Sequence, residues 1–317
     1  MRAIILLASS LLLLLGCQSA KSPDIQKTLT QAVQAFEQEN YEQALFLAEK
    51  VLAKDSHQPD ALILKAQCKI KEKDRATGLQ LLDLLLQKNP TYHKALAYRS
   101  LLLAEDKKLD AALVDIDAAL KLAPDQPNYQ SEKGIIYQQM GQHEKAIQSF
   151  SAIIEQHPKH ESAYYFRAIN KNKMKDKTGA LADFDQAIQL HRDVPEMYSK
   201  RAFLQMDLNN YPAAILDFSK VIVLAPEENQ NNQIAIAFNN RGFARYKNEA
   251  FGQALDDINY SLQLFPENAY AYKNRALAHL AQGKNKEACH DLVLALQHKF
   301  TAQYGQEVVE LRKKHCR

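Results

Sequence analysis

The chain has 317 residues, of which 46% are hydrophobic and 24% are charged, so it is not a disordered polypeptide. Lys and Arg together number 40 against 37 Asp and Glu, a net charge of +3 that excludes nucleic-acid binding driven by a strongly basic surface. Nine glycines are too few for a Gly-rich phosphate loop or a turn-dense β fold. At roughly 150 residues per domain, the length alone predicts about two domains.

The N-terminus reads as a targeting segment. The apolar run from Ile4 to Leu15 follows Met1-Arg2, is too short to span a membrane, and ends in Gly16-Cys17. It resembles the signal of bacterial lipoproteins, which are cut before a cysteine that carries lipid. The resemblance implies a signal peptide over residues 1–16, a lipid on Cys17 and an anchor linker over residues 17–24. An uncleaved signal anchor and an ordinary signal peptide that contains a cysteine are the alternatives.

The residue after Cys17 bears on location. In lipoproteins of Gram-negative bacteria, Asp at this place commonly means retention in the inner membrane, and here it is Gln18. The resemblance therefore implies the outer membrane. Because no acidic cluster follows between Gln18 and Asp24, we expect the protein to face the periplasm, with a surface-exposed orientation still open. A lipid would anchor the chain to the membrane without spanning it.

A period of 34 residues runs through the rest of the chain. Proline and alanine both recur with this period, at spacings of 34, 68 (twice 34) and 40 residues. The spacing of 40 is one period plus an insertion of six residues, which both residue types show at the same place. The prolines are Pro90, Pro124, Pro158, Pro226 and Pro266. The alanines are Ala44, Ala112, Ala146, Ala180, Ala214, Ala254 and Ala288. A fixed period of this length predicts one solenoid or array with no domain boundary, rather than two domains. We expect such a stack to need few left-handed turns, which fits the scarcity of glycine.

Each period contains two helices. In the repeat that begins at Pro127, a first amphipathic segment ends at Gly141. A second apolar stripe follows at Ala146, Phe150 and Ile153, with the i, i+4, i+7 spacing of a helix, before a proline ends it. The pattern predicts a helix, a tight turn and a second helix in every repeat.

This pattern resembles the tetratricopeptide repeat, which has small residues at positions 8 and 20, a large one at 24 and Pro at 32, counted from the first residue of each repeat. Position 8 here holds Ala32, Ala66, Ser100, Gly134, Ala168, Ala202, Gly242 and Ala276. Eight repeats begin at Ile25, Pro59, His93, Pro127, Glu161, Pro195, Ala235 and Ala269. The resemblance implies an all-α, right-handed superhelical solenoid over residues 25–302. Residues 303–317 then read as one C-terminal capping helix.

A row of cations occupies position 7, where Lys or Arg stands from the second repeat onward. In five repeats an Asp follows 16 residues later, which in an antiparallel helix pair lies at the same level. We therefore predict a structural ladder of ion pairs that ties the two helices of a repeat. An anion-binding track is the alternative. The pairs are Arg99/Asp115, Arg167/Asp183, Arg201/Asp217, Arg241/Asp257 and Arg275/Asp291.

The remaining three cysteines divide into two roles. Cys68 lies in the middle of a predicted helix and reads as a buried small side chain. Cys289 and Cys316 lie 27 residues apart, and a disulfide between them would hold the capping helix to the last repeat. Two free thiols are the alternative.

No arrangement of residues indicates catalysis. His290 and His298 lie eight residues apart, too far for a metal pair on one helix, and His157 and His160 flank a loop proline. Phosphate loops, zinc-spaced cysteines and nucleophile elbows are absent from the sequence. We expect no enzyme activity, no metal, no cofactor and no small-molecule substrate.

The first helices of tetratricopeptide repeats line a concave groove, so the resemblance implies a binding site there. Rings and amides suit a peptide or protein segment, because rings supply contact area and amides bond to a ligand backbone. The candidates in the fifth to eighth repeats are Tyr165, Phe203, Asn239, Asn240, Phe243, Tyr246, Tyr270, Lys273 and Asn274. Some tetratricopeptide domains bind the tails of chaperones through a clamp of Lys, Asn and Arg residues. Of the positions that form this clamp, only Asn240 holds the matching residue here. The alternative is that the apolar stripe at position 9 merely packs neighbouring first helices.

The sequence thus predicts a non-enzymatic protein-interaction scaffold that is lipid-anchored in the bacterial envelope. The alternative is a structural subunit of an outer-membrane assembly that uses its convex face or its ends. The six extra residues Asn229–Ile234 are either a recognition element or an extended loop and helix start. No residue identifies the partner or the oligomeric state.

Overall fold

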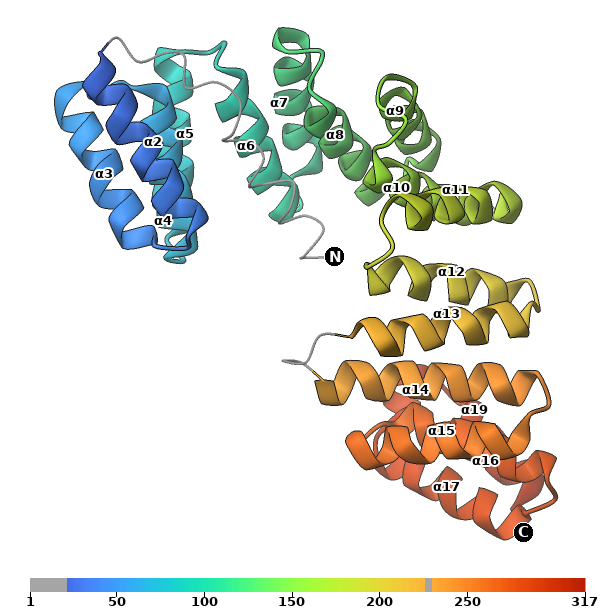
Figure 1. The fold of residues 1–317 in the computed structure, drawn as a ribbon. Helices are drawn as coiled ribbons and strands as arrows, with labels where there is room; N and C mark the ends of the chain where they lie inside the picture. The colour runs from blue at the N-terminus through green and yellow to red at the C-terminus, as the bar shows by residue number, and fades with distance from the viewer. Residues whose placement is uncertain (1–21, 226–229, 317) are drawn as a thin grey trace. The chain divides into compact units, whose positions relative to one another are not determined.

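The computed structural model describes residues 22–225 and 230–316, and the helices of these segments follow one another in antiparallel pairs (Figure 1). Cys17 and the predicted signal peptide lie outside the described residues, as does Asn229 of the insert. None of the described helices is both long enough and apolar enough to cross a membrane.

The first helix of each repeat begins at or near the predicted repeat start. These helices are α2 (Pro23–Glu37), α4 (Pro59–Lys71), α6 (His93–Glu105), α8 (Pro127–Gln139), α10 (Glu161–Lys173), α12 (Pro195–Asp207), α14 (Gln230–Lys247) and α16 (Ala269–Ala281). Four of them have Pro in their first turn, where a missing backbone N–H removes no hydrogen bond. The longest is α14, whose 18 residues take in most of the insert. The described part of the insert is therefore an extended helix start.

The second helix of each repeat begins at position 17. These helices are α3 (Tyr41–Lys54), α5 (Arg75–Lys88), α7 (Leu109–Leu122), α9 (His143–Gln156), α11 (Lys177–Leu190), α13 (Tyr211–Leu224), α15 (Phe251–Leu264) and α17 (Asn285–Gln297). The all-α solenoid of helix pairs predicted from the sequence is the fold observed.

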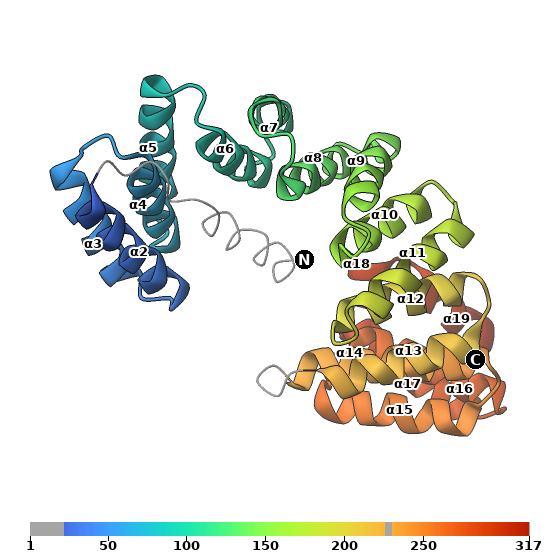
Figure 2. The ribbon, with the colours of Figure 1, turned by 45° about the horizontal axis from the view of Figure 1, so that its top comes forward.

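The chain divides into two compact units, an N-terminal unit that ends at Met174 and a C-terminal unit that begins at Lys175 (Figure 2). The division falls in the turn between α10 and α11, inside the fifth repeat. The sequence period does not reveal this division. Each repeat contacts only its neighbours, and a place with fewer contacts along the array leaves the 34-residue spacing unchanged.

Close approach of the two helices depends on the small residues at position 8. A Cβ atom added to Gly134 would lie 2.7 Å from the ring of Phe150, and one added to Gly242 would lie 2.7 Å from Ile258. Phe150 and Ile258 both occupy position 24 and are fully buried. The large residue at position 24 thus fills the space that the small residue opposite leaves, as the sequence pattern predicts.

The left-handed turns are more numerous than expected. Position 15 has a positive φ in every repeat, although only two of the eight residues are glycines. The residues are Glu39, Lys73, Lys107, Gly141, Lys175, Asn209, Glu249 and Gly283. In the third repeat the amides of Lys107 and Lys108 donate to the carbonyls of Ala104 and Leu103, which is the Schellman pattern. Our expectation of few left-handed turns is therefore wrong: these hydrogen bonds hold non-glycine residues in that conformation.

The C-terminal tail also differs from its prediction. Instead of one capping helix it forms α18 (Phe300–Tyr304) and α19 (Glu307–His315), separated by Gly305 with φ of 91° and ψ of −165°. Non-glycine residues avoid this region, so the glycine breaks the helix that the sequence pattern favours. Phe300 and Val308 are fully buried in a cluster with Ala276, Leu292 and other residues of α16 and α17.

Candidate peptide-binding face

Four of the five predicted ion pairs of the ladder lie at hydrogen-bonding distance. In each, the Nε and Nη2 atoms of arginine donate to the two oxygens of one carboxylate: 2.7 and 2.8 Å for Arg99 to Asp115, and 2.8 and 2.7 Å for Arg201 to Asp217. The pairs of Arg241 with Asp257 and of Arg275 with Asp291 have the same geometry. All four aspartates are buried, so each needs this partner.

The remaining guanidinium nitrogen reaches the preceding repeat, which sequence reasoning missed. Nη1 of Arg99 donates to Asp83 at 2.8 Å, and Nη1 of Arg201 donates to Asp185 at 2.7 Å. Arg241 and Arg275 donate in the same way to Ser219 and Asn259. The acceptor always occupies position 25, usually 16 residues before the arginine, and this polar column could have been read from the sequence. Each of these arginines therefore links three helices rather than two.

Position 7 behaves differently in three repeats. Lys65 pairs with Glu49 at 2.9 Å and Lys133 with Asp117 at 2.7 Å, so the ion pairs of these lysines are with the preceding repeat. Arg167 donates to Ser151 at 3.0 Å. Arg167 and Asp183 belong to different compact units, and their pairing stays a prediction.

Aromatic rings at position 4 lie against four of the position-7 arginines. The guanidinium carbons lie 5.0–5.7 Å from the ring centroids at i−3. At this distance a cation is attracted by the face of the ring. The ring and arginine pairs are Tyr164 and Arg167, Tyr198 and Arg201, Phe238 and Arg241, and Tyr272 and Arg275. The position-7 cations are thus held on several sides, which favours the structural ladder over an anion-binding track.

Three of the polar residues predicted to line the groove are buried between first helices. Asn239, Lys273 and Asn274 are 3%, 3% and 0% exposed. The Asn274 amide donates to Asn239 at 3.0 Å and so joins α16 to α14. As direct ligand contacts, Asn239 and Asn274 are therefore wrong predictions. The reason is physical: buried amides must find partners, and the nearest partner is on the next first helix.

Tyr165 is a further departure. It lies in the N-terminal unit, is 4% exposed and packs edge-on against Phe166 with ring centroids 5.2 Å apart. The other candidates all lie in the C-terminal unit. Its burial removes the contact area that a groove residue needs.

The remaining candidates keep exposed surface. Phe203 is 48% exposed, whereas the other side chains at position 9 are buried or half-buried, and its ring contacts Phe218 edge-on at 5.3 Å. Phe243 and Tyr246 are stacked at 5.9 Å and are half-buried, as are Asn240 and Tyr270. These five residues form what we call the aromatic face of the C-terminal unit.

Lys273 is enclosed at the end of this face. Its Nζ atom lies 5.4 Å from the ring centroid of Phe243 and 4.9 Å from that of Tyr270, and 3.1 Å from a carboxylate oxygen of Glu307 on α19. Tyr270 also contacts the rings of Phe300 and Tyr304 at 5.7 and 5.1 Å. Burial, together with the charge of Glu307, raises the pKa of Tyr270. The tail thus supplies the carboxylate that completes a cage of two rings and one acid around Lys273.

The cysteines separate as the sequence indicates. The sulfurs of Cys289 and Cys316 are joined at 2.03 Å, which links α17 to the end of α19. Cys68 is buried and free, and burial raises the pKa of its thiol to about 12. Such a thiol stays protonated and unreactive near neutral pH.

One half-buried carboxyl was not predicted. Glu132 on α8 accepts a hydrogen bond from Ser100 on α6 at 3.3 Å. Burial raises the pKa of Glu132 to about 8, with a further rise from the charge of Glu105. The only sequence signal is an acid at position 6, where the other repeats hold rings, amides, Leu, Lys or Thr.

The residues described by the structure contain no group of three or more His, Cys, Asp or Glu placed to hold a metal ion. His160 caps α10, because its ring nitrogen accepts from the Ala163 amide at 3.3 Å, and His298 stacks on Tyr272 at 5.3 Å. Both histidines thus have structural roles.

Comparison with known proteins agrees with this geometry. Three segments, residues 35–98, 132–160 and 240–304, match models of the tetratricopeptide repeat. None of the curated proteins matches the sequence.

Solved structures share the fold at low sequence identity. A tetratricopeptide repeat protein from Parabacteroides merdae is 20% identical over 80% of this chain and 97% of its own, with a TM-score of 0.57. The C-terminal part of a repeat protein from Cytophaga hutchinsonii is 17% identical over 78% and 98%, with a TM-score of 0.59. A chain of the Cut9–Hcn1 hetero-tetramer of the APC/C is 15% identical over 100% and 60%, with a TM-score of 0.60. The chain therefore carries tetratricopeptide repeats and folds as a solenoid of them.

Proposed function

We propose that this protein is a non-enzymatic interaction scaffold that binds a protein or peptide segment on the aromatic face of its C-terminal unit. The observation that carries the proposal is Phe203, a large apolar side chain that is 48% exposed and packs edge-on against the buried ring of Phe218. A fold of paired helices with nearest-neighbour packing presents extended surfaces suited to such partners.

The chemistry of the face fits a peptide better than a small molecule. Phe203, Phe243 and Tyr246 offer ring area, which dominates the binding energy of many interfaces. Asn240 offers an amide that bonds to a ligand backbone. Among the described residues the face lacks the convergent titratable groups that a reaction would need.

The location is part of the proposal. We propose that Cys17 carries lipid and holds the scaffold at the outer membrane, facing the periplasm. The support is the sequence resemblance of residues 1–17 to a lipoprotein signal. Replacing Cys17 with Ser should leave the chain unlipidated and release it from the membrane fraction. An unchanged mass shift and an unchanged membrane fraction would contradict the anchor.

A second candidate, a structural subunit that binds through its convex side, is favoured by a different observation. On α13, Leu216 and Val223 are 70% and 76% exposed and lie seven residues apart, on one face of the helix. Replacing one of these exposed apolar side chains is therefore a matched control for replacing an exposed ring of the aromatic face.

Affinity capture with crosslinking from envelope extracts tests the two sites. Phe203→Ala should lower partner recovery at least about tenfold, because truncating a ring anchor commonly costs about 2 kcal/mol. Leu216→Ala should leave recovery unchanged, and circular dichroism should show both variants folded. The opposite pattern, loss with Leu216→Ala and none with Phe203→Ala, would move the site to the convex side.

A further inference from the structure

Helix α19 is weakly attached along its length and strongly attached at its end. Of its nine residues Val308 alone is fully buried, and its last turn carries Arg312, Lys313 and Lys314 in solvent. Its first residue, Glu307, pairs with Lys273, and the residue after its last turn, Cys316, is bonded to Cys289.

The connection to α18 contains a hinge. Gly305 has a backbone conformation that only glycine adopts readily, and the residues around it are exposed. Phe300, before the hinge, is fully buried, whereas most residues after it are exposed. Movement of α19 about Gly305 would therefore leave α18 and its buried ring in place.

The surface beneath α19 has a defined chemistry. Lys273 is 4% exposed at its side chain, whereas its partner Glu307 is 51% exposed. Among the described residues Glu307 is the one carboxylate that pairs with Lys273. If Glu307 moved away, the ammonium would remain between the rings of Phe243 and Tyr270 and would need another carboxylate.

We propose that α19 is a strap that the Cys289–Cys316 disulfide holds over a carboxylate-binding site formed by Lys273, Phe243 and Tyr270. Glu307 is the internal occupant of this site, and the ligand is an acidic segment of a protein partner. The inference rests on the proposed function, since the site continues the aromatic face at Phe243 and Tyr270.

The tail itself indicates the form of the ligand. Tyr304 places its ring on Tyr270 at 5.1 Å, and Glu307 places its carboxylate on Lys273. A partner segment with an aromatic residue followed three residues later by an acid would make both contacts. Positive charge at Lys273 and ring area at Tyr270 together select that chemistry over a basic or purely apolar segment.

Opening the strap is a two-electron reduction by an external dithiol. A thiolate of the dithiol attacks one sulfur of the Cys289–Cys316 bond and forms a mixed disulfide, and the displaced sulfur takes up a proton. The second thiol of the reductant then attacks the mixed disulfide and frees the other cysteine. The products are two protein thiols and an oxidised reductant.

Binding of a synthetic peptide tests the site. The probe is a labelled, end-capped peptide with the sequence of residues 303–310, QYGQEVVE, and its control has Gln in place of the acid that matches Glu307. Fluorescence anisotropy should show binding at least about tenfold tighter to the reduced full-length protein than to the oxidised protein. Cys316→Ser should reproduce the reduced protein without a reductant. The Gln peptide should lose most of this gain, as should the probe with a Cys316→Ser/Lys273→Met variant.

Hydrogen exchange separates the strap from general unfolding. On reduction, the amides of residues 307–315 should exchange at least about tenfold faster, while those of α16 and α17 keep their protection. Equal exchange in the two redox states, or equal peptide affinity in them, would overturn the proposal. These outcomes are independent of partner capture by Phe203→Ala, which tests the proposed function in the oxidised protein.

Discussion

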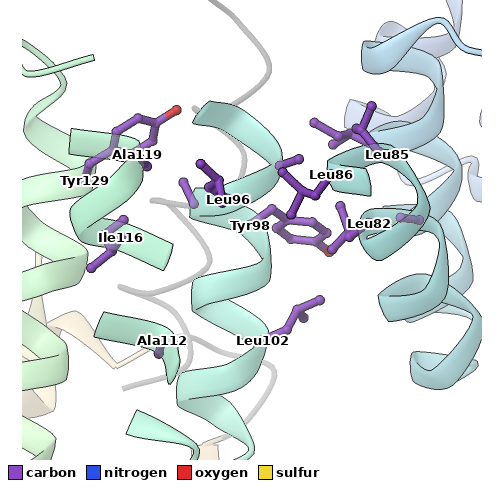
Figure 3. Packing of buried hydrophobic residues seen from close by; sticks show 14 of the residues in the cluster. Leu82, Leu85, Leu86, Leu96, Tyr98, Leu102, Ala112, Ile116, Ala119 and Tyr129 are labelled. Atoms are coloured by element: carbon purple, nitrogen blue, oxygen red, sulfur yellow. The ribbon is translucent and has the colours of Figure 1, made fainter. Parts of the chain in front are cut away.

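The two compact units hold their repeats together in different ways. In the N-terminal unit one apolar cluster runs without a break from α4 to α8 and includes Leu82, Tyr98 and Ile116 (Figure 3). In the C-terminal unit the buried apolar residues form separate small clusters, for example one around Phe218 and another around Ile258. Three of the four observed arginine ties lie in the C-terminal unit.

The difference shows two solutions to one problem. A repeat must be attached to the next by its second helix, and the attachment is either continuous apolar packing or a charged group that reaches across. Arg201 joins α12 to both α11 and α13, so one side chain links three helices of two neighbouring repeats. We infer that the stability of the C-terminal unit depends more on these ties than that of the N-terminal unit.

The largest expected effect is the loss of such a tie. Arg201→Met leaves the 4%-exposed Asp217 as an unpaired buried carboxylate, which should destabilise the C-terminal unit by about 3–5 kcal/mol in denaturant unfolding. Arg99→Met is the matched variant, because Arg99 makes the same three hydrogen bonds in the N-terminal unit. We expect it to cost less, at about 3 kcal/mol.

A double substitution provides the control. Arg201→Met with Asp217→Leu removes both charges and should recover most of the lost stability, since the cost lies in the unpaired carboxylate. Equal losses for the two single variants would show that the two units depend on their ties to the same degree, against the comparison drawn above.

A smaller effect is expected from adding a methyl group at the close contact between α8 and α9 in the N-terminal unit. Gly134→Ala places a methyl 2.7 Å from the Phe150 ring and should destabilise by about 1–3 kcal/mol in the same measurement. Gly252→Ala on α15 is the control. No atom lies within 4 Å of its added Cβ, and a helical glycine is weaker than alanine, so it should stabilise by about 0.5–1 kcal/mol. Destabilisation by both variants would point to a backbone effect rather than to packing.

The smallest effect should come from the turns. Lys107 has φ of 62°, and Lys107→Gly removes the conflict between its Cβ and the backbone, with an expected gain of about 1 kcal/mol. Gly141→Ala at the same position of the next repeat should lose a similar amount. Thermal unfolding followed by circular dichroism measures both. A loss with Lys107→Gly would mean that the flexibility of glycine in the unfolded chain outweighs the relief of strain.

Much of the fold could be predicted because it is local. The period, the helix pair within each repeat and the pairing of Arg99 with Asp115 all follow from residues within one repeat, where helix geometry fixes which positions face each other. The candidate site was predicted less well. Phe203 is exposed as expected, whereas Asn239 and Asn274 are buried against each other.

The sequence by itself determined the repeat: where helices begin, which small residues let them approach, and which charges match inside each pair. The tertiary structure decided what happens between repeats and beyond the last one. It placed Asp83 and Asp185 against arginines of the following repeats, turned Lys273 toward Glu307 and broke the tail at Gly305. The physical reason is that a buried polar group takes whichever partner the neighbouring helix presents, and the period does not record that choice.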